Sequence, residues 1–241
     1  MRMKRLAVTI WLVGMAGCAQ PRGVIRDLPP PVMNTNYVAR PAPPPVPLPV
    51  TPPPASEPPR MIGPKTIVVD AGHGGKDPGT QGVSSIPEKA FNLLMVQQLI
   101  QELSRRGANV VPTRTTDVFL TLEARAAVAR RTRADLFISI HADYSPKRTN
   151  SGATLYIARN ASRASISAAD SIAAGFRRHG IQYNGTRRRD FRVLTKHPRP
   201  AVLIECGFMS NRADALLLNS PDYRARLARA IADGIAAFAG N

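Results

Sequence analysis

The chain has 241 residues, and its two cysteines are too few for a disulfide framework to organise the fold. Its formal net charge is +17, but the basic residues are spread along predicted helices and only 5% of the residues are aromatic, which argues against a nucleic-acid partner. The excess of positive charge instead favours an anionic polymer or surface as the partner, with a solvated basic face as the simpler alternative.

Residues 1–17 have the pattern of a secretory signal peptide. Basic residues in Met1–Arg5 precede an apolar run over Leu6–Ala16 that is too short to cross a bilayer. The run ends in small residues directly before Cys18, and this arrangement resembles the cleavage site of bacterial lipoproteins, in which the cysteine is acylated. We therefore expect a lipid on Cys18 and a periplasmic protein anchored to the outer membrane. Ala19, directly after the cysteine, is compatible with transfer to that membrane. The alternative is an ordinary signal peptide with an incidental cysteine.

Residues 18–64 hold most of the 23 prolines and show no apolar period long enough to build a core. Proline runs such as that at residues 52–54 favour polyproline II, in which the chain rises by ~3.1 Å per residue. The segment is therefore predicted to be a semi-rigid linker that lets the anchored protein act at a distance from the membrane. A proline-rich ligand for a partner domain is the alternative.

Residues 65–241 carry the pattern of one α/β domain. Short apolar runs predict strands over 66–69, 109–113, 135–140, 153–158, 191–194 and 201–204. Helical periodicity predicts helices over 88–106, 122–133, 164–179 and 223–238. Because apolar strands alternate with helices, we expect a mostly parallel, twisted sheet with helices on both faces in a single domain.

Three of the predicted strands end in chemically reactive side chains. The strands that begin at residues 66, 135 and 201 lead into His73, His141 and Glu205, respectively. In an α/β sheet the carboxyl ends of parallel strands share one edge, and ligands bind outside that edge. Two histidines and a carboxylate that leave one position open form a catalytic zinc set. The topology leaves the carboxylate ligand open among four residues: Glu88, Glu205, Asp70 and Asp143.

Four motifs of this domain resemble, in order, those of the zinc-dependent N-acetylmuramoyl-L-alanine amidases. They are Val68–Gly79, Glu88–Asn92, Ser139–Asp143 and Pro200–Asn211. The resemblance covers essentially all of residues 65–241 and implies a catalytic domain with a mostly parallel sheet between helices. It implies that His73, Glu88 and His141 bind one zinc ion and that Glu205 is the essential catalytic carboxylate. It also implies peptidoglycan as the substrate, with hydrolysis of the amide between N-acetylmuramic acid and L-alanine of the stem peptide.

The chemistry of these residue types agrees with that reaction. Zinc can polarise the carbonyl of an amide and lower the pKa of water to about 7. Glu205 would then take a proton from this water and pass it to the leaving amine. Asn92 lies one helical turn after Glu88 and is predicted to orient that ligand, with a surface or buried amide as the alternative. Cys206 is predicted to be a buried, inert thiol, since alternation along the strand points it away from Glu205.

The stretch between His141 and Glu205 is filled by predicted strands and helices. We therefore expect no inserted helix that covers the zinc site, and a protein activator is possible but not implied. Residues 187–189 are three consecutive arginines that could meet carboxylates of the stem peptide, although a solvated loop is the simpler expectation. His179 and His197 are expected to face solvent.

Two other functions stay open on the sequence. One is a different zinc peptidase or a deacetylase that acts on the same polymer. The other is a catalytically silent lipoprotein that binds or regulates the cell wall, although the presence of all four motif residues argues against it. A nucleic-acid function is disfavoured further, because a secretory signal would remove the protein from nucleic acid.

Overall fold

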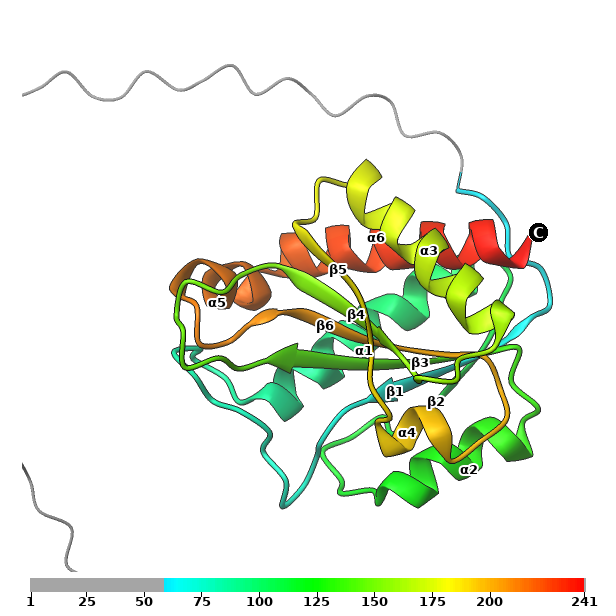
Figure 1. Ribbon diagram of the computed structural model, residues 1–241, viewed down its shortest axis with the longest axis horizontal. Helices are drawn as coiled ribbons and strands as arrows, with labels where there is room; N and C mark the ends of the chain where they lie inside the picture. The colour runs from blue at the N-terminus through cyan, green and yellow to red at the C-terminus, as the bar shows by residue number, and fades with distance from the viewer. Residues whose placement is uncertain (1–58, 241) are drawn as a thin grey trace, which may run out of the picture. The chain divides into compact units, whose positions relative to one another are not determined.

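The computed structural model describes residues 59–240, so the predicted signal peptide, Cys18 and nearly all of the predicted linker lie outside the described residues. In the described part, one sheet holds six strands in the order β2-β1-β3-β6-β4-β5 (Figure 1). The strands are β1 (Thr66–Ala71), β2 (Asn109–Pro112), β3 (Leu136–Asp143), β4 (Ala153–Ile157), β5 (Tyr183–Arg188) and β6 (Ala201–Phe208).

The directions of the strands confirm the predicted, mostly parallel sheet. Strand β1 pairs in parallel with β2 and β3, and β3 pairs in parallel with β6. Strand β4 is antiparallel to β6 and parallel to β5. The carboxyl ends of β1, β3 and β6 therefore lie at one edge of the sheet, as the sequence predicts.

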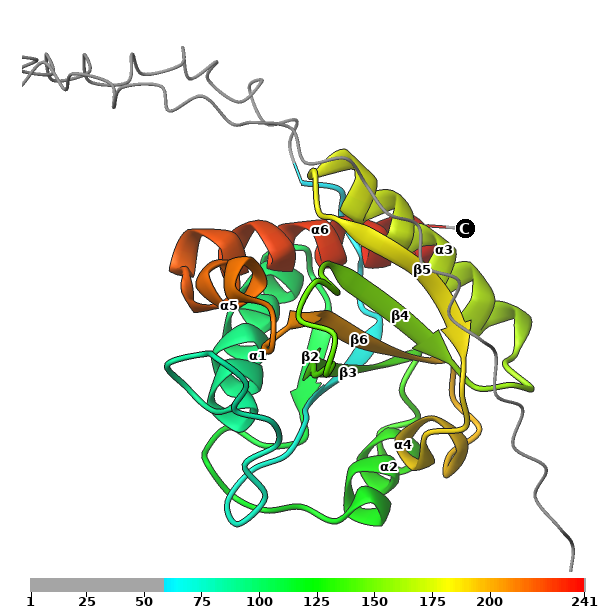
Figure 2. The same cartoon turned by 60° about the vertical axis from the view of Figure 1, so that its left-hand side comes forward.

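Helices cover both faces of the sheet, as Figure 2 shows. They are α1 (Glu88–Arg105), α2 (Leu122–Arg131), α3 (Arg163–Arg178), α4 (Arg192–Thr195), α5 (Arg212–Asn219) and α6 (Pro221–Ala239). The first core lies between the sheet and α1, α3 and α6, and the second lies between the sheet and α2 and α4. Ile67 and Val69 of β1 belong to the first core, and Val68 between them belongs to the second. Successive side chains of a strand point to opposite faces, so a strand between two helix layers is apolar at every position.

Three elements differ from the sequence-based expectation. The strand predicted over 191–194 is wrong, because residues 192–195 form α4 and bury Val193 and Leu194 in the second core. A short apolar run fits a buried helical turn as well as a strand, so periodicity does not distinguish them. The solvated loop expected over 187–189 is also wrong in part, since its first two arginines belong to β5, a polar strand that periodicity missed. Helix α5 is the third difference. It is not predicted from the sequence, because it is too short to show a clear period.

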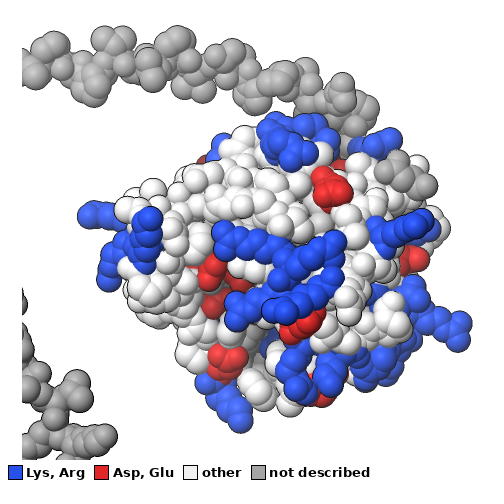
Figure 3. Space-filling model, in the orientation of Figure 1, with Lys and Arg blue, Asp and Glu red and all other residues white. Residues whose placement is uncertain are grey.

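None of the helices in the described part is long and apolar enough to cross a bilayer. Figure 3 shows Lys and Arg side chains spread across one face of this part, with acidic side chains between them. The basic charge on this face is therefore distributed over several elements, as the sequence predicts.

Candidate metal centre

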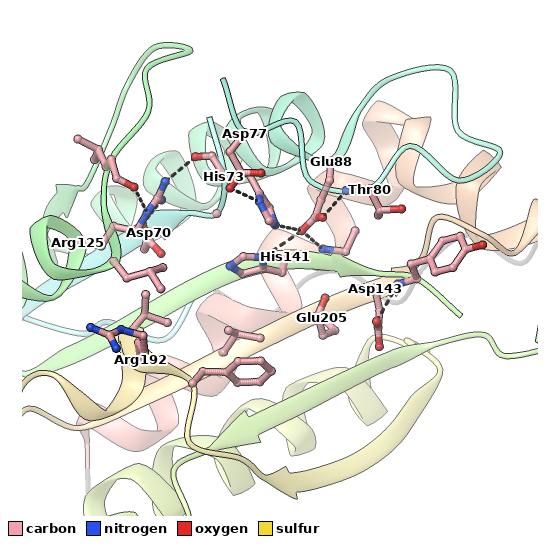
Figure 4. Close-up of a pocket in the computed structure, with 18 of the residues that line it drawn as sticks. Asp70, His73, Asp77, Thr80, Glu88, Arg125, His141, Asp143, Arg192 and Glu205 are labelled. Atoms are coloured by element: carbon pink, nitrogen blue, oxygen red, sulfur yellow. Dashed lines mark hydrogen bonds and ion pairs between the residues drawn. The ribbon is translucent and has the colours of Figure 1, made fainter. Parts of the chain in front are cut away.

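Two histidines and Glu88 come together at the carboxyl edge of the sheet (Figure 4). His73 lies in the loop after β1, Glu88 is the first residue of α1, and His141 lies in β3. One ligand atom from each residue lies within 4.8 Å of the other two. Nε2 of His73 is 3.1 Å and Nδ1 of His141 is 3.0 Å from the same oxygen, Oε1 of Glu88. Three side chains that are distant in sequence therefore face one point.

Several donors hold Glu88 in this position. The backbone N–H of Thr80 donates to Oε2 at 3.0 Å, and that of Ala142 donates to Oε1 at 3.2 Å. The side-chain amide of Asn92, which the sequence assigns to orienting Glu88, donates to Oε1 at 3.4 Å. The same amide donates to the carbonyl of Gly72 at 3.1 Å. Asn92 therefore connects α1 to the loop after β1 in addition to contacting Glu88.

Two glycines leave room for the cluster. A Cβ atom at Gly72 would lie 2.2 Å from Cε1 of His141, and one at Gly79 would lie 2.5 Å from Oε2 of Glu88. Gly79 also has a φ of +65°, in the left-handed region that favours glycine. Any larger residue at either position would displace a member of the cluster.

Burial and neighbouring charges shift the pKa of Glu88 in opposite directions. Burial raises the pKa of its carboxyl group, but hydrogen bonds from His141 and His73, together with their charge, outweigh burial and hold the pKa well below its usual range. Burial lowers the pKa of His73, whereas Glu88 and Asp77 raise it by more. The cluster therefore favours the ionised carboxylate of Glu88, which is the form that binds a metal.

Asp77 is a candidate functional residue that the sequence analysis missed. Its Oδ2 lies 2.8 Å from Nδ1 of His73, while the other ring nitrogen of His73 faces Glu88. A carboxylate in this position fixes the tautomer and the ring orientation of a metal-binding histidine. Its spacing of four residues from His73, inside the same glycine-rich motif, is the sequence signal that points to it.

Asp70, one of the four carboxylates left open by the topology, lies outside the cluster. It is fully buried, and it accepts hydrogen bonds from Nη1 of Arg125 and from Oγ of Ser139, both at 2.8 Å. Arg125 also donates to the carbonyl oxygen of His73 at 2.6 Å. His73 has a φ of 58°, which is uncommon for a residue other than glycine. The buried network therefore supports the loop after β1, which carries His73.

Glu205 lies beside the cluster on β6, where the register pairs it with His141 of β3. Its Oε2 is buried and has no hydrogen-bond partner among residues 59–240. Burial raises the pKa of Glu205 well above its usual range, the charges of Asp143 and Glu88 raise it further, and Arg189 opposes them. A carboxyl group with a raised pKa takes up a proton more readily than an exposed one.

The cluster and Glu205 line one pocket of about 570 Å³ (Figure 4). Its wall combines the loop after β1, the start of α1 and the end of β3 with the segment that precedes α2. The chain between His141 and Glu205 folds into β4, α3, β5 and α4 and contributes Tyr144, Phe191 and Arg192 to the wall. The pocket therefore brings apolar and charged side chains to the edge of the sheet that carries the His73, Glu88 and His141 cluster.

The donor set suits a zinc ion. Two imidazole nitrogens and one carboxylate oxygen are ligands that zinc takes in catalytic sites, where a further position stays open to water. Glu205 lines the same pocket but is not one of the three converging residues, so a carboxylate is left beside the cluster. The residues present therefore fit zinc, with Glu88 as the carboxylate nearest the two histidines.

The remaining predicted residues have different surroundings. Cys206 is a free thiol with 1% exposure, which agrees with the predicted buried cysteine. The expectation that His197 faces solvent is wrong, and His179 is half-buried and paired. His197 is 7% exposed and packs against Phe137, and Nε2 of His179 lies 2.6 Å from Asp233.

Comparisons with known proteins identify the family of the chain. A family model described as N-acetylmuramoyl-L-alanine amidase matches residues 67–237. "Uncharacterized protein YqiI" of Bacillus subtilis is 36% identical over 179 residues, which is 72% of this chain and 84% of YqiI. The probable cell wall amidase LytH of Staphylococcus aureus is 34% identical over 174 residues, which is 71% of this chain but only 57% of LytH.

Among solved structures, the catalytic domain of the amidase CwlV from Bacillus (Paenibacillus) polymyxa var. colistinus is similar to this chain, with a TM-score of 0.65 and 38% identity. The match covers 71% of this chain and 96% of that domain. The amidase of Clostridium difficile 630 has a TM-score of 0.69 and 29% identity over 73% of this chain and 97% of its own. The chain therefore belongs to the N-acetylmuramoyl-L-alanine amidase family.

Proposed function

We propose that this protein hydrolyses the amide between N-acetylmuramic acid and L-alanine of the peptidoglycan stem peptide, with one zinc ion held by His73, Glu88 and His141. Glu205 is the general base and acid. The observation that carries the proposal is the convergence of three ligand atoms within 4.8 Å beside a carboxylate whose buried oxygen has no partner in the described part of the chain. Membership of the amidase family indicates which bond is cleaved.

The zinc ion and Glu205 have different roles in the proposed reaction. A zinc ion at the three ligands supplies a Lewis acid for the amide carbonyl and makes water more acidic. Glu205 accepts a proton from the attacking water and then donates it to the leaving nitrogen, which releases the α-amino group of L-alanine. The raised pKa of Glu205 suits this double role, because it makes the carboxylate a stronger proton acceptor than an exposed one.

Two positioning residues complete the proposal. Asp77 fixes the ring of His73 through Nδ1, and Asn92 connects Glu88 to the carbonyl of Gly72. Both act through a ligand rather than on the substrate. Such outer partners set the orientation, and hence the affinity, of the ligands that they contact.

Replacement of Glu205 by glutamine tests the assignment. Wild-type protein loaded with zinc and mixed with sacculi should release stem peptides that carry a free L-alanine amino end, as measured by mass spectrometry. Glu205→Gln should keep one zinc ion per chain and lose about 10²–10⁴-fold in kcat, because the glutamine side chain cannot take up the proton from water. Glu102→Gln, in the last part of α1, is the control and should keep both zinc and activity.

The other outcomes identify the alternatives. Free acetate among the products would point to a deacetylase, and a shortened stem peptide would point to a peptidase. Loss of zinc from Glu205→Gln would make this residue a ligand. Zinc retained by a wild-type protein with no turnover would favour a wall-binding role.

We also propose that the protein acts in the periplasm, held at the outer membrane by a lipid on Cys18. Residues 18–64 would serve as the linker and residues 65–241 as the catalytic domain. The support is the signal-like sequence before Cys18 and the proline-rich composition after it. An extended linker would let an anchored enzyme reach a polymer at a distance from the membrane.

A further inference from the structure

Three consecutive arginines lie at the end of the edge strand β5, with Arg187 and Arg188 in the strand and Arg189 directly after it. Its register places Arg187 opposite Tyr156 and Arg188 opposite Ile157 of β4, and the backbone N–H of Arg189 continues the ladder by donating to Ile157. Because side chains alternate along a strand, Arg187 and Arg189 share the face opposite to that of Arg188. Nη1 of Arg188 donates to a backbone carbonyl, that of Arg159, at 2.8 Å.

The face with Arg187 and Arg189 borders the metal pocket. Arg187 lines a polar groove of about 570 Å³, and this groove shares Asp143 and Tyr144 with the pocket that holds the metal-binding residues. The other groove residues are mostly hydrogen-bonding side chains, among them Asn150, Ser151, Gln182 and Asn184. The guanidinium of Arg189 lies 4.8 Å from the ring centre of Phe191, which belongs to the wall of the metal pocket. The polar groove lined by Arg187 therefore adjoins the pocket of the candidate metal centre, and Arg189 lies beside the wall of that pocket.

Neither of these two cations forms an ion pair within the described part of the chain. Arg192 pairs with Glu123, and Arg159 pairs with Asp190, whereas Arg187 and Arg189 have no carboxylate within ion-pairing distance among residues 59–240. Packing against Phe191 holds Arg189 in place, which reduces the entropy lost when an anion binds.

We infer that Arg187 and Arg189 bind the free carboxylates of the stem peptide, on the leaving-amine side of the scissile bond, and make the enzyme selective for peptides that are not amidated. The inference rests on the proposed amidase function. The sugar part of that substrate offers neutral hydroxyl and acetamido groups, whereas the peptide part carries carboxylates beyond its first residue. An extended peptide moves away from the scissile amide by about 3.5 Å per residue, along the polar groove. Arginine binds carboxylates with two parallel hydrogen bonds, which gives it the required specificity.

Direct binding of the peptide tests this inference without any need for turnover. The probe is the free tetrapeptide L-Ala-γ-D-Glu-diaminopimelate-D-Ala, compared by calorimetric titration with the same peptide whose carboxylates are carboxamides. Zinc-loaded wild-type protein should bind the acid form at least tenfold more tightly. Arg187→Gln/Arg189→Gln should reduce this ratio to about one, and the KM for the acid muramyl peptide should rise by a similar factor while kcat changes little.

Arg188→Gln is the matched control, because it removes one charge from the same strand on the opposite face. It should keep the preference for the acid peptide. Equal binding of the two peptides by the wild type, or a preference that survives in the double variant, would overturn the inference even if amidase activity is present. A preference lost equally in Arg188→Gln would also overturn it, since that result would reflect overall charge. Failure of the proposed function is a separate result, namely no stem peptide released from sacculi.

Discussion

His73 is fixed by neighbouring residues at both its backbone and its ring. Its backbone lies in the left-handed region, with a φ of 58°, and it is not a glycine. Arg125 holds its carbonyl oxygen at 2.6 Å and Asp77 holds its ring at 2.8 Å, so both ends of the residue are fixed. A ligand held in this way is preorganised for a metal, because less conformational freedom is lost on binding.

Removal of the Asp77 carboxylate should therefore weaken zinc binding. We expect Asp77→Ala to lower the zinc affinity by about 10–100-fold, since the His73 ring loses the partner that sets its tautomer. Competition with a chromophoric chelator measures this change. Asp117→Ala is the control, because Asp117 binds Gly75 and Lys89 in the same region without contacting a proposed ligand. An affinity of Asp77→Ala equal to that of the wild type would contradict the role.

At the scale of the elements, one carboxylate of α6 joins the ends of two other helices. Asp233 accepts hydrogen bonds from Arg106, directly after α1, and from His179, directly after α3. Burial raises the pKa of Asp233, but these two partners outweigh burial and lower it below its ordinary value of 3.8. The three helices on this face of the sheet are thus connected through a group that ionises more readily in the folded chain than in the unfolded chain.

The lowered pKa of Asp233 determines how the stability of the fold changes with pH. A depressed carboxyl pKa stabilises the fold above pH 3.8, and that contribution is lost as the pH falls through the lower folded-state pKa. Asp233→Asn should therefore reduce the free energy of unfolding by about 2 kcal/mol at pH 7. The difference from the wild type should shrink below pH 3.8 in denaturant titrations. Asp170→Asn, at an exposed position of α3, is the control, and an equal loss in it would refute a specific role for Asp233.

At the scale of the whole molecule, the proposed anchor and the positive charge would both favour contact between the enzyme and its substrate. The excess of Lys and Arg over Asp and Glu favours association with an anionic polymer at a distance, and a membrane tether would raise the local concentration of enzyme near that polymer. The catalytic chemistry does not require the tether, because the proposed zinc ligands and Glu205 all lie in the family-matched region. Anchoring and hydrolysis should therefore be separable.

Cys18→Ser tests that separation. We expect the variant to leave the membrane fraction and to hydrolyse soluble muropeptides at the wild-type rate, because the change removes only the site of acylation. Fractionation followed by an activity assay measures both properties. A variant that still sediments with membranes would contradict the lipid anchor. Cys206→Ser is a useful comparison for the loss of a thiol, and it should stay with the membranes.

The sequence by itself determines the class of fold and the small group of residues around the reaction centre. Apolar runs that alternate with helical periods specify a mostly parallel sheet, and the strand ends bring His73, His141 and Glu205 to one edge. Both results follow from local patterns, since each strand and the residue that follows it are adjacent in the chain. The family motifs add Glu88 by resemblance rather than by topology.

Only the tertiary structure decides how the carboxylates differ. Glu88 faces both histidines, Asp70 is engaged by Arg125 and Ser139, and Glu205 is left with a buried oxygen that has no partner in the described residues. Each of these environments is made by residues distant in sequence, so no local pattern encodes it. The same holds for Arg187 and Arg189. A polar edge strand lacks an apolar period, so only the folded chain reveals that Arg187 lines the groove and that Arg189 packs on Phe191.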